Sequence, residues 1–299
     1  MLHFVLKLKK NIFTVLTAVL CVMLLSACKG VDEPQQNQTS EQNVYVSIAE
    51  ELKAFFEGAA KKAILKNSIE INSDMLCVSK ARGTIEIDGA GFVLTGSGDC
   101  VIRLESETSI LLNNITIVGG MDTIGCMADS CVSGKNLVLK AQMSAIRSNG
   151  KLVIGKESDI TAESSLGYGI MADTLEIEDN ASVKVSAEKN AVNILKKRLV
   201  LAEGSLLDAV TKNDYSAVKC TGTLVMNDGS AFIVKNKSEY HGAQIDYIEI
   251  NGDVTIKARG GDKGAGLFIF GLEDDYTVNG YCKSDLRKEN GQGSIEFKD

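Results

Sequence analysis

The sequence predicts an all-β fold in which short parallel strands stack as about eight to nine coils, preceded by one N-terminal helix. From Ile69 onward apolar and polar residues alternate with a period of two, which is typical of strands with one buried face. Triplets of the form apolar-x-apolar then recur, mostly 23–27 residues apart, and two further short apolar runs follow in each unit. The triplets begin at Ile85, Ile110, Leu137, Leu152, Leu175, Leu199, Leu224 and Ile248.

The two further runs give each unit three short strands. The second run appears as Ile160/Ala162, Val183/Val185, Leu207/Ala209 and Phe232/Val234, with Val254/Ile256 slightly early. The third joins a small residue at a bend to an inward branched one, as in Gly169/Ile170, Ala191/Val192 and Ala217/Val218. Turns such as "EDN", "AEG" and "NDG" separate the runs. Because a single unit cannot bury its apolar face, we expect equivalent strands to stack in parallel around a continuous core.

An antiparallel β-sandwich or a propeller is the competing fold. Those folds would show two-residue hairpin turns and a blade period of about 40 residues, often with aromatic markers. The spacing favours the coil, although one gap, between Leu137 and Leu152, is only 15 residues. We interpret this gap as a shortened or distorted turn that follows an insertion, "VGGMDTIGCMADSCVSGK". Function is therefore sought in residues 119–150 and in the outward side chains of Tyr168, Met171, Lys184 and Asn193.

Both ends of such a stack would expose unpaired strand edges and need covering. Residues 44–66 are predicted to form the N-terminal capping helix, with Ser47 and Glu50 as a capping box. Residues 67–271 are assigned to the coils. The irregular segment 272–299 is expected to close the other end.

The first 28 residues carry a targeting signal. A basic start is followed by an apolar stretch too short for a membrane span of about 20 residues. It ends in "LSAC", which resembles the bacterial lipobox and implies cleavage after residue 27 and lipidation of Cys28. The alternative is an ordinary signal peptide or anchor with a chance cysteine. Residues 28–43 are polar and read as a flexible tether. We expect a lipoprotein held on a membrane of the cell envelope, facing the periplasm or the cell surface.

The cap helix and stacked coils together resemble right-handed parallel β-helix proteins of the pectin-lyase-like type. The phrases "GYGI…TLEI" and "SAVKCTGTLVMNDGSAFIV" are similar to bacterial surface β-helix domains described as carbohydrate-binding or adhesin-like lipoproteins. The resemblance covers residues 47–271 and implies a rigid surface that binds a polysaccharide or a surface protein. The net charge of −7 disfavours nucleic acid, which needs clustered Lys or Arg.

No catalytic set is visible, so the sequence predicts a protein without enzymatic activity, cofactor or metal. His241 is the one histidine left after His3 departs with the signal. Gly-x-Ser-x-Gly, phosphate-loop and HExxH motifs are absent, as are the residue sets of polygalacturonase-like hydrolases. A coil can nevertheless bring two carboxylates together from neighbouring rungs. A polysaccharide lyase or hydrolase on the same scaffold is therefore the alternative, and a structural spacer without a ligand is a third.

Three tyrosines precede the third strand of their coils: Tyr168, Tyr215 and Tyr240. With His241 they form a candidate ligand surface, because aromatic faces beside polar groups suit flat sugar rings. The alternative is that these tyrosines merely cover turns, since their offsets from the bends differ.

Six cysteines follow Cys28, and an exported chain permits disulfides. Cys77 and Cys100 lie 23 residues apart, about one coil, and are one candidate pair. Cys126 and Cys131 flank a short loop and are the second. Cys220 is expected to be a buried free thiol. The spacings and the absence of a neighbouring histidine disfavour a metal site.

Overall fold

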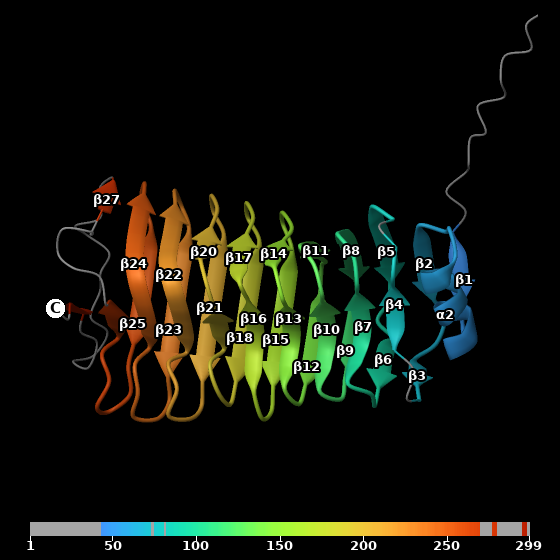
Figure 1. Cartoon of the computed structure of the whole chain (residues 1–299), viewed down its shortest axis with the longest axis horizontal. Helices are drawn as coiled ribbons and strands as arrows, with labels where there is room; N and C mark the ends of the chain where they lie inside the picture. The colour runs from blue at the N-terminus through green and yellow to red at the C-terminus, as the bar shows by residue number, and fades with distance from the viewer. Residues whose placement is uncertain (1–42, 73–74, 81, 270–276, 280–294, 298–299) are drawn as a thin grey trace, which may run out of the picture. The chain divides into compact units, whose positions relative to one another are not determined.

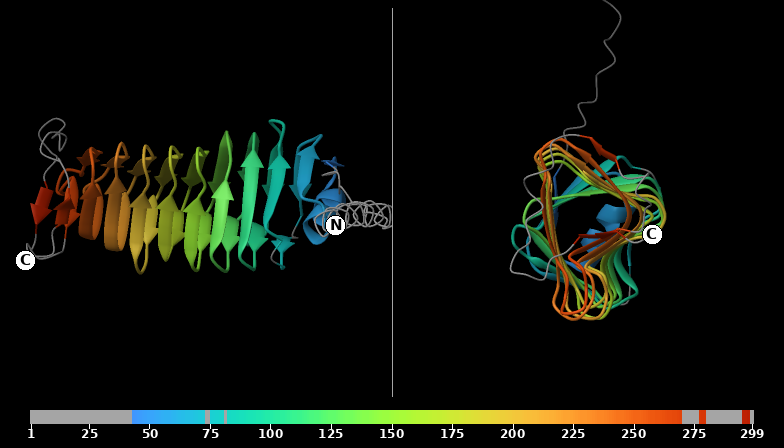
Figure 2. Two further views of the ribbon diagram at one scale, coloured as in Figure 1. Left: turned by 90° about the horizontal axis from the view of Figure 1, so that it is seen from above. Right: turned by 90° about the vertical axis from the view of Figure 1, so that its left-hand side faces the viewer.

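The computed structural model describes residues 43–72, 75–80, 82–269, 277–279 and 295–297. These residues belong to one compact unit that spans Gln42–Asp299. The unit is an all-β parallel solenoid of about nine turns, as predicted, and its described residues contain one helix (Figure 1). Each coil contributes strands to three faces, which we call the first, second and third faces in chain order. Seen along the stacking axis, successive coils lie behind one another around a common core (Figure 2).

The faces are ladders of parallel strands joined by backbone hydrogen bonds. The first consists of β1 (Val44–Val46), β2 (Lys62–Leu65), β5 (Thr84–Asp88), β8 (Thr108–Asn113), β11 (Ser130–Ser133), β14 (Lys151–Ile154), β17 (Thr174–Ile177), β20 (Arg198–Leu201), the second halves of β22 (Val218–Asn227) and β24 (Ala243–Asn251), and β27 (Thr277–Asn279). The second consists of β3 (Ile69–Ile71), β6 (Val93–Gly96), β9 (Ile115–Val118), β12 (Leu137–Ala141), β15 (Asp159–Ser164), β18 (Ser182–Ala187), β21 (Leu206–Thr211), β23 (Ala231–Asn236) and β25 (Thr255–Arg259).

The third face continues into the first without a break in the last coils. It consists of β4 (Leu76–Val78), β7 (Cys100–Leu104), β10 (Asp122–Cys126), β13 (Ser144–Ser148), β16 (Tyr168–Ala172), β19 (Val192–Ile194), the first halves of β22 and β24, β26 (Leu267–Ile269) and β28 (Ile295–Phe297). Because β22 and β24 run through both faces, the first and third faces form one 19-stranded sheet and the second a separate nine-stranded sheet.

The core is built from identical positions stacked coil upon coil. On the third face one inward column is fully buried from β7 to β24, and its register pairs each residue with the next. Its members are Ile102, Ile124, Ile146, Ile170, Val192, Val218 and Ala243. Burial of each aliphatic side chain contributes about 1.5–3 kcal/mol relative to exposure. The predicted stacking of Ile170 on Val192 is confirmed.

From β5 onward, each turn from the first face to the second contains a residue in the left-handed backbone conformation, and the turn at Ala90 contains Gly91 as a second one. Apart from Gly91, these residues are Ala90, Asn114, Asn136, Glu157, Asn180, Gly204, Gly229 and Gly252, with φ between 50° and 113°. Asparagine and glycine tolerate this region best, which explains the turns "EDN", "AEG" and "NDG". The Asn136 amide also donates a 3.0 Å hydrogen bond to the Asn114 side chain one coil earlier.

The irregularity between Leu137 and Leu152 is not an insertion or a shortened turn, and that interpretation was wrong. Leu137 lies in β12 on the second face, whereas Leu152 lies in β14 on the first. The first-face strand of that coil is β11, in which Ser130 pairs with Thr108 on one side and Leu152 on the other. Each step is 22 residues, so the coils here are regular. The triplet of this coil, residues 130–132, was not recognised because Ser130 is polar, although Val132 is buried at the inward position.

The helix is shorter than the predicted span 44–66. It covers Ala49–Glu57 (α2), and its flanks are the paired strands β1 and β2. The Ser47/Glu50 capping box does not form; instead the Ser47 N–H donates a 2.7 Å hydrogen bond to the Glu51 carboxylate. After Gly58, which is the C-cap, the period changes from 3.6 to two. The helix ends at this point, and residues 62–65 form the next strand of the first face.

The helix nevertheless belongs to the N-terminal coils as expected of a cap. Leu52, Phe55 and Phe56 are buried in the common core. The Arg82 guanidinium donates to the carbonyls of Phe55 at 3.1 Å and Phe56 at 2.8 Å, two acceptors that the end of the helix leaves open. Of the segment 272–299, the structure describes only β27 and β28, which extend the first and third faces.

Candidate binding groove on the third face

A column of outward residues on the third face contains two arginines separated by a glycine. Arg103 in β7 pairs with Gly125 in β10, and Gly125 pairs with Arg147 in β13. The two arginine Cα atoms are therefore two strand spacings apart, about 9.6 Å. Because Gly125 carries no side chain, this rung, which we call the open rung, places no side chain of its own between the two arginines, although Gly125 itself is buried.

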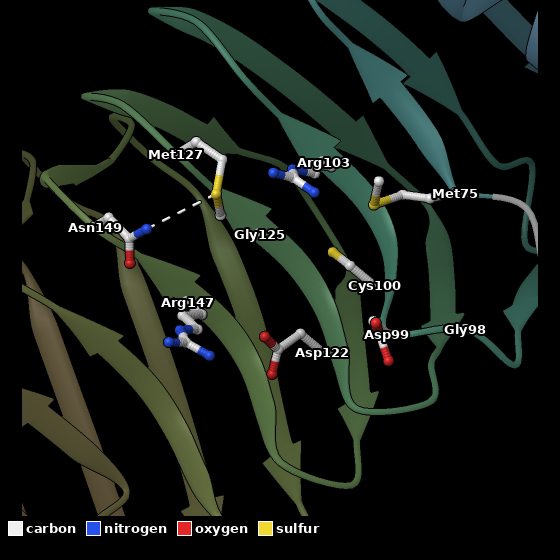
Figure 3. A pocket seen from close by; sticks show the side chains of 10 residues that line it. All are labelled: Met75, Gly98, Asp99, Cys100, Arg103, Asp122, Gly125, Met127, Arg147 and Asn149. Carbon is white, nitrogen blue, oxygen red and sulfur yellow. Dashed lines mark hydrogen bonds between the residues drawn. The ribbon is translucent and has the colours of Figure 1, made fainter.

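A groove of about 420 Å³ lies over these strands (Figure 3). It combines two cations, two carboxylates, an amide and sulfur groups, which is the mixed lining of a polar-ligand site rather than of an apolar pocket. Its lining residues are Met75, Gly98, Asp99, Cys100, Arg103, Asp122, Gly125, Met127, Arg147 and Asn149.

The two arginines have unused hydrogen-bonding capacity. The Arg147 side chain forms no hydrogen bond and no ion pair with any other residue that the structure describes. Arg103 Nε lies 3.5 Å from the Glu105 carboxylate, yet this buried nitrogen forms no hydrogen bond. A guanidinium carries five N–H donors in a planar fork that matches a carboxylate. The groove thus presents donors that other described parts of the chain do not satisfy.

In the groove Asp122 lies between Arg147 and Asp99, and Arg103 lies apart from the carboxylates (Figure 3). Burial raises the pKa of Asp122 above its ordinary value. Hydrogen bonds from Ser144 and the charge of Arg147 oppose that shift, while the nearby charge of Asp99 adds to it. The two carboxylates offer acceptor oxygens to a cation or to several hydrogen-bond donors.

Cys100 lies beneath the open rung. A Cβ atom placed on Gly125 would lie 3.0 Å from the Cys100 sulfur and 3.7 Å from Met127 Cε. Burial raises the pKa of the Cys100 thiol to about 12. Because the thiolate is the reactive form, this cysteine is part of the floor of the groove and not a nucleophile at neutral pH.

The predicted tyrosines lie further along the stack. Tyr215 and Tyr240 are each 42% exposed and precede the paired residues Val218 and Ala243 by three positions, so they occupy equivalent places on neighbouring coils. Tyr168 is one position out of this column. Its ring lies 5.5 Å from the Lys189 ammonium in a cation–π arrangement.

His241 is held in place by its neighbours. Its ring stacks on Phe268 with centroids 4.5 Å apart, and its edge meets the Tyr240 ring at 4.7 Å. His241 Nδ1 accepts a 3.0 Å hydrogen bond from the Ala265 backbone N–H. The histidine therefore ties the turn before β24 to the next coil.

The structure joins neither candidate cysteine pair. Cys77 lies opposite Arg103, and Cys100 lies opposite Asp122. Cys126 points into the core, whereas Cys131 lies outward beside Ser133. The five described cysteines, Cys77, Cys100, Cys126, Cys131 and Cys220, are free thiols. Cys220 is buried, as expected.

Several predicted features lie outside the described residues, namely the signal, Cys28, the tether and Cys282. In the parts of the chain that are described, no helix has the length and apolarity needed to cross a membrane. Nor do the described His, Cys, Asp and Glu side chains form a cluster of three or more that could hold a metal ion.

Sequence reasoning missed the groove, although a signal for it exists. Arg103, Gly125 and Arg147 are spaced by 22 residues, the same step that relates Thr108, Ser130 and Leu152. Treating residues 118–135 as an insertion hid this column. Asp122, Gly125 and Arg147 of the groove fall within 119–150, the part of the chain in which function was sought.

Comparisons with known proteins concern the fold alone. No protein-family model matches the sequence, and no curated protein matches it. The solved structure described as "L. reuteri 53608 SRRP" is similar at a TM-score of 0.54 and 14% identity, covering 86% of this chain and 100% of that chain. A second, "L. reuters 100-23 SRRP", has a TM-score of 0.43 and 12% identity, covering 80% and 98%. The class is thus an all-β parallel solenoid.

Proposed function

We propose that this chain is a lipid-anchored protein of the cell envelope whose rigid solenoid binds carbohydrate or another extracellular partner through the third face. The observation that carries the proposal is the groove, where Arg147 and the Arg103 Nε hold unused donors beside the Asp99 and Asp122 carboxylates. Buried or half-buried polar groups without partners are costly in a scaffold and are typical of ligand sites. The resemblance to adhesin-like surface β-helix domains supports the same role.

The anchor is supported by the basic start, the apolar stretch and "LSAC" ending at Cys28. Labelling of cells with radioactive palmitate tests it. The intact chain is expected to take up label and to sediment with membranes, and Cys28→Ser is expected to lose the label. Label retained in Cys28→Ser would contradict lipidation at this residue.

Binding is tested with the detergent-solubilised full chain on a glycan array. We expect a restricted set of glycans to bind, and Arg103→Gln combined with Arg147→Gln to lose most of the signal. Lys219→Gln is the matched control, since Lys219 occupies the same outward column several coils away. If the double variant and the control bind alike, the groove is not the binding site.

The alternative activity, a polysaccharide lyase or hydrolase, would operate in the same groove. The raised pKa of Asp122 and the nearby Asp99 are the features that favour it, because a glycosidase needs a carboxylic acid beside a second carboxylate. Incubation with polysaccharides, followed by detection of reducing ends or unsaturated products, separates the two. We expect no cleavage. Cleavage that Asp122→Asn abolishes would establish the enzyme instead.

A further inference from the structure

We infer that the groove recognises a zwitterionic carbohydrate, one that carries a carboxylate and an unacetylated amino group on neighbouring sugars. This inference rests on the proposed binding function and names its ligand class. The lining contains a cationic pair, Arg103 and Arg147, and an anionic pair, Asp99 and Asp122, with Arg147 next to Asp122 (Figure 3). A ligand with both charges can satisfy both pairs at once.

The cationic pair fits one carboxylate. Arg103 and Arg147 flank the open rung at Gly125, so two planar donor forks can reach an anion that lies over the glycine. Arg147 has no ion-pair partner among the residues described, and Arg103 Nε lacks a hydrogen bond. Two like charges so placed favour an anion between them.

The anionic pair fits one ammonium group. Asp99 and Asp122 both line the groove on neighbouring coils, and the Asp122 backbone N–H donates a 2.9 Å hydrogen bond to the Asp99 carbonyl. Burial raises the pKa of Asp122, and the charge of Asp99 adds to that shift, so a cation beside the two carboxylates would favour their charged forms. A hydroxyl group could also donate there, but it would bring no positive charge.

The balance of charges also disfavours ligands of a single sign. A polyanion bound to the two arginines would also lie close to the two carboxylates, and a polycation bound to the carboxylates would lie close to the arginines. A neutral sugar would leave the guanidinium groups without an anionic partner. Selectivity therefore arises from the two pairs together.

The test uses three tetrasaccharides of one backbone, which alternates an unacetylated amino sugar with a hexuronic acid. The first is the zwitterion itself, the second is its N-acetylated form, and the third is its carboxyl-reduced form. We measure the affinity of each for the solubilised full chain by calorimetry. Loss of one charged partner typically weakens binding about tenfold or more, so the two modified forms should bind at least that much more weakly than the zwitterion.

Two variants assign the charges to their pairs. Arg147→Gln should weaken the zwitterion about tenfold while leaving the carboxyl-reduced form unchanged, because that form has no carboxylate to lose. Asp122→Asn should weaken the zwitterion while leaving the N-acetylated form unchanged. Lys219→Gln should alter none of the three.

The outcomes separate this inference from the proposed function. If glycans on the array bind through the groove but the N-acetylated tetrasaccharide binds as well as the zwitterion, the ligand class is wrong and the proposed function stands. Equal loss for all three tetrasaccharides in each variant would likewise contradict the charge assignment. If no array glycan responds to Arg103→Gln with Arg147→Gln, the groove itself is excluded and both proposals fail.

Discussion

The two halves of the third face share one register but present different surfaces. In the first half, Gly125 leaves an open rung between Arg103 and Arg147. In the second half the same column holds a side chain on every rung, and its members are Met171, Asn193, Lys219, Gln244 and Phe268. The scaffold is equivalent in both, since the inward column is buried throughout. In this comparison, the groove lies where the outward column has a glycine in place of a residue with a side chain.

The bends of both halves join successive coils through side-chain hydrogen bonds. In the second half, the Asn190 amide donates a 2.6 Å hydrogen bond to the Ser216 carbonyl, and the Asn236 amide donates one of 2.6 Å to the Tyr215 carbonyl. In the first half, the Thr123 hydroxyl donates to the Ala145 carbonyl. The halves therefore differ in their outward columns rather than in their bends.

The largest expected effect is on the shared core, and it should occur in both halves. Ile146→Ala under the groove and Val192→Ala in the second half each remove a fully buried side chain. We expect Ile146→Ala to lower the free energy of unfolding by about 2–5 kcal/mol, with Val192→Ala at the lower end because valine is smaller. Urea unfolding followed by circular dichroism measures this. A loss below about 1 kcal/mol for Ile146→Ala would show that the column is not packed as described.

The next effect distinguishes the halves through ligand binding. Gly125→Leu adds a side chain between the arginines, and its Cβ would lie 3.0 Å from the buried Cys100 sulfur, which has to move. We expect glycan binding to fall about tenfold or more, with some loss of melting temperature because the added side chain crowds the groove floor. Met171→Leu makes a volume-conserving change in the same column of the second half and should leave binding unaltered. Equal binding by both variants would place the ligand elsewhere.

A smaller effect concerns how the Asp122 carboxylate changes the stability of the folded protein, and how that contribution depends on pH. Because burial raises the pKa of Asp122 in the folded state above 3.8, the folded protein binds that proton more tightly than the unfolded chain. The charged form therefore lowers stability at pH 7, and this penalty disappears as the pH falls below 3.8. Asp122→Asn should raise the melting temperature at pH 7 and make no difference at the acidic end. An equal shift at both pH values would contradict this cause.

The smallest effect is on the rates at which the cysteines react with an alkylating agent, and it leaves the fold intact. Burial raises the pKa of Cys100, Cys126 and Cys220 to about 12, so these thiols should resist alkylation at pH 8. Cys77 and Cys131 are only half-buried, although burial raises the pKa of each as well. Iodoacetamide labelling with peptide mass spectrometry should show these two reacting faster. Faster labelling of Cys100 would indicate that the groove floor opens.

Much of the fold could be predicted from the sequence because its rule is local and repeated. The alternation of apolar and polar residues predicted the strands, and the spacing of the apolar triplets predicted the coils. The pairing of Leu175 with Leu199 is an example. Prediction failed where a polar side chain occupied an expected apolar position, at Ser130. It also failed at residues 62–65, where helix-forming residues were placed in β2 by pairing with β5, an interaction remote in sequence.

The candidate site was harder to predict because it also depends on pairing between residues that are remote in the sequence. Its parts are a single arginine or a glycine in each of three coils, and none is distinctive alone. They become a site only when residues 22 apart are brought into register. The tyrosines were easier to notice because aromatic residues are rare in this chain, at 5% of the composition. Two of them, Tyr215 and Tyr240, do occupy equivalent positions.

The most direct test of binding at the first half of the third face is a crystal structure of the chain with the zwitterionic tetrasaccharide. The groove hypothesis predicts that the sugar carboxylate lies over Gly125 within hydrogen-bonding distance, about 2.7–2.9 Å, of the Arg147 guanidinium. A ligand stacked instead on Tyr215 and Tyr240 would contradict it and transfer the binding role to the second half of the stack.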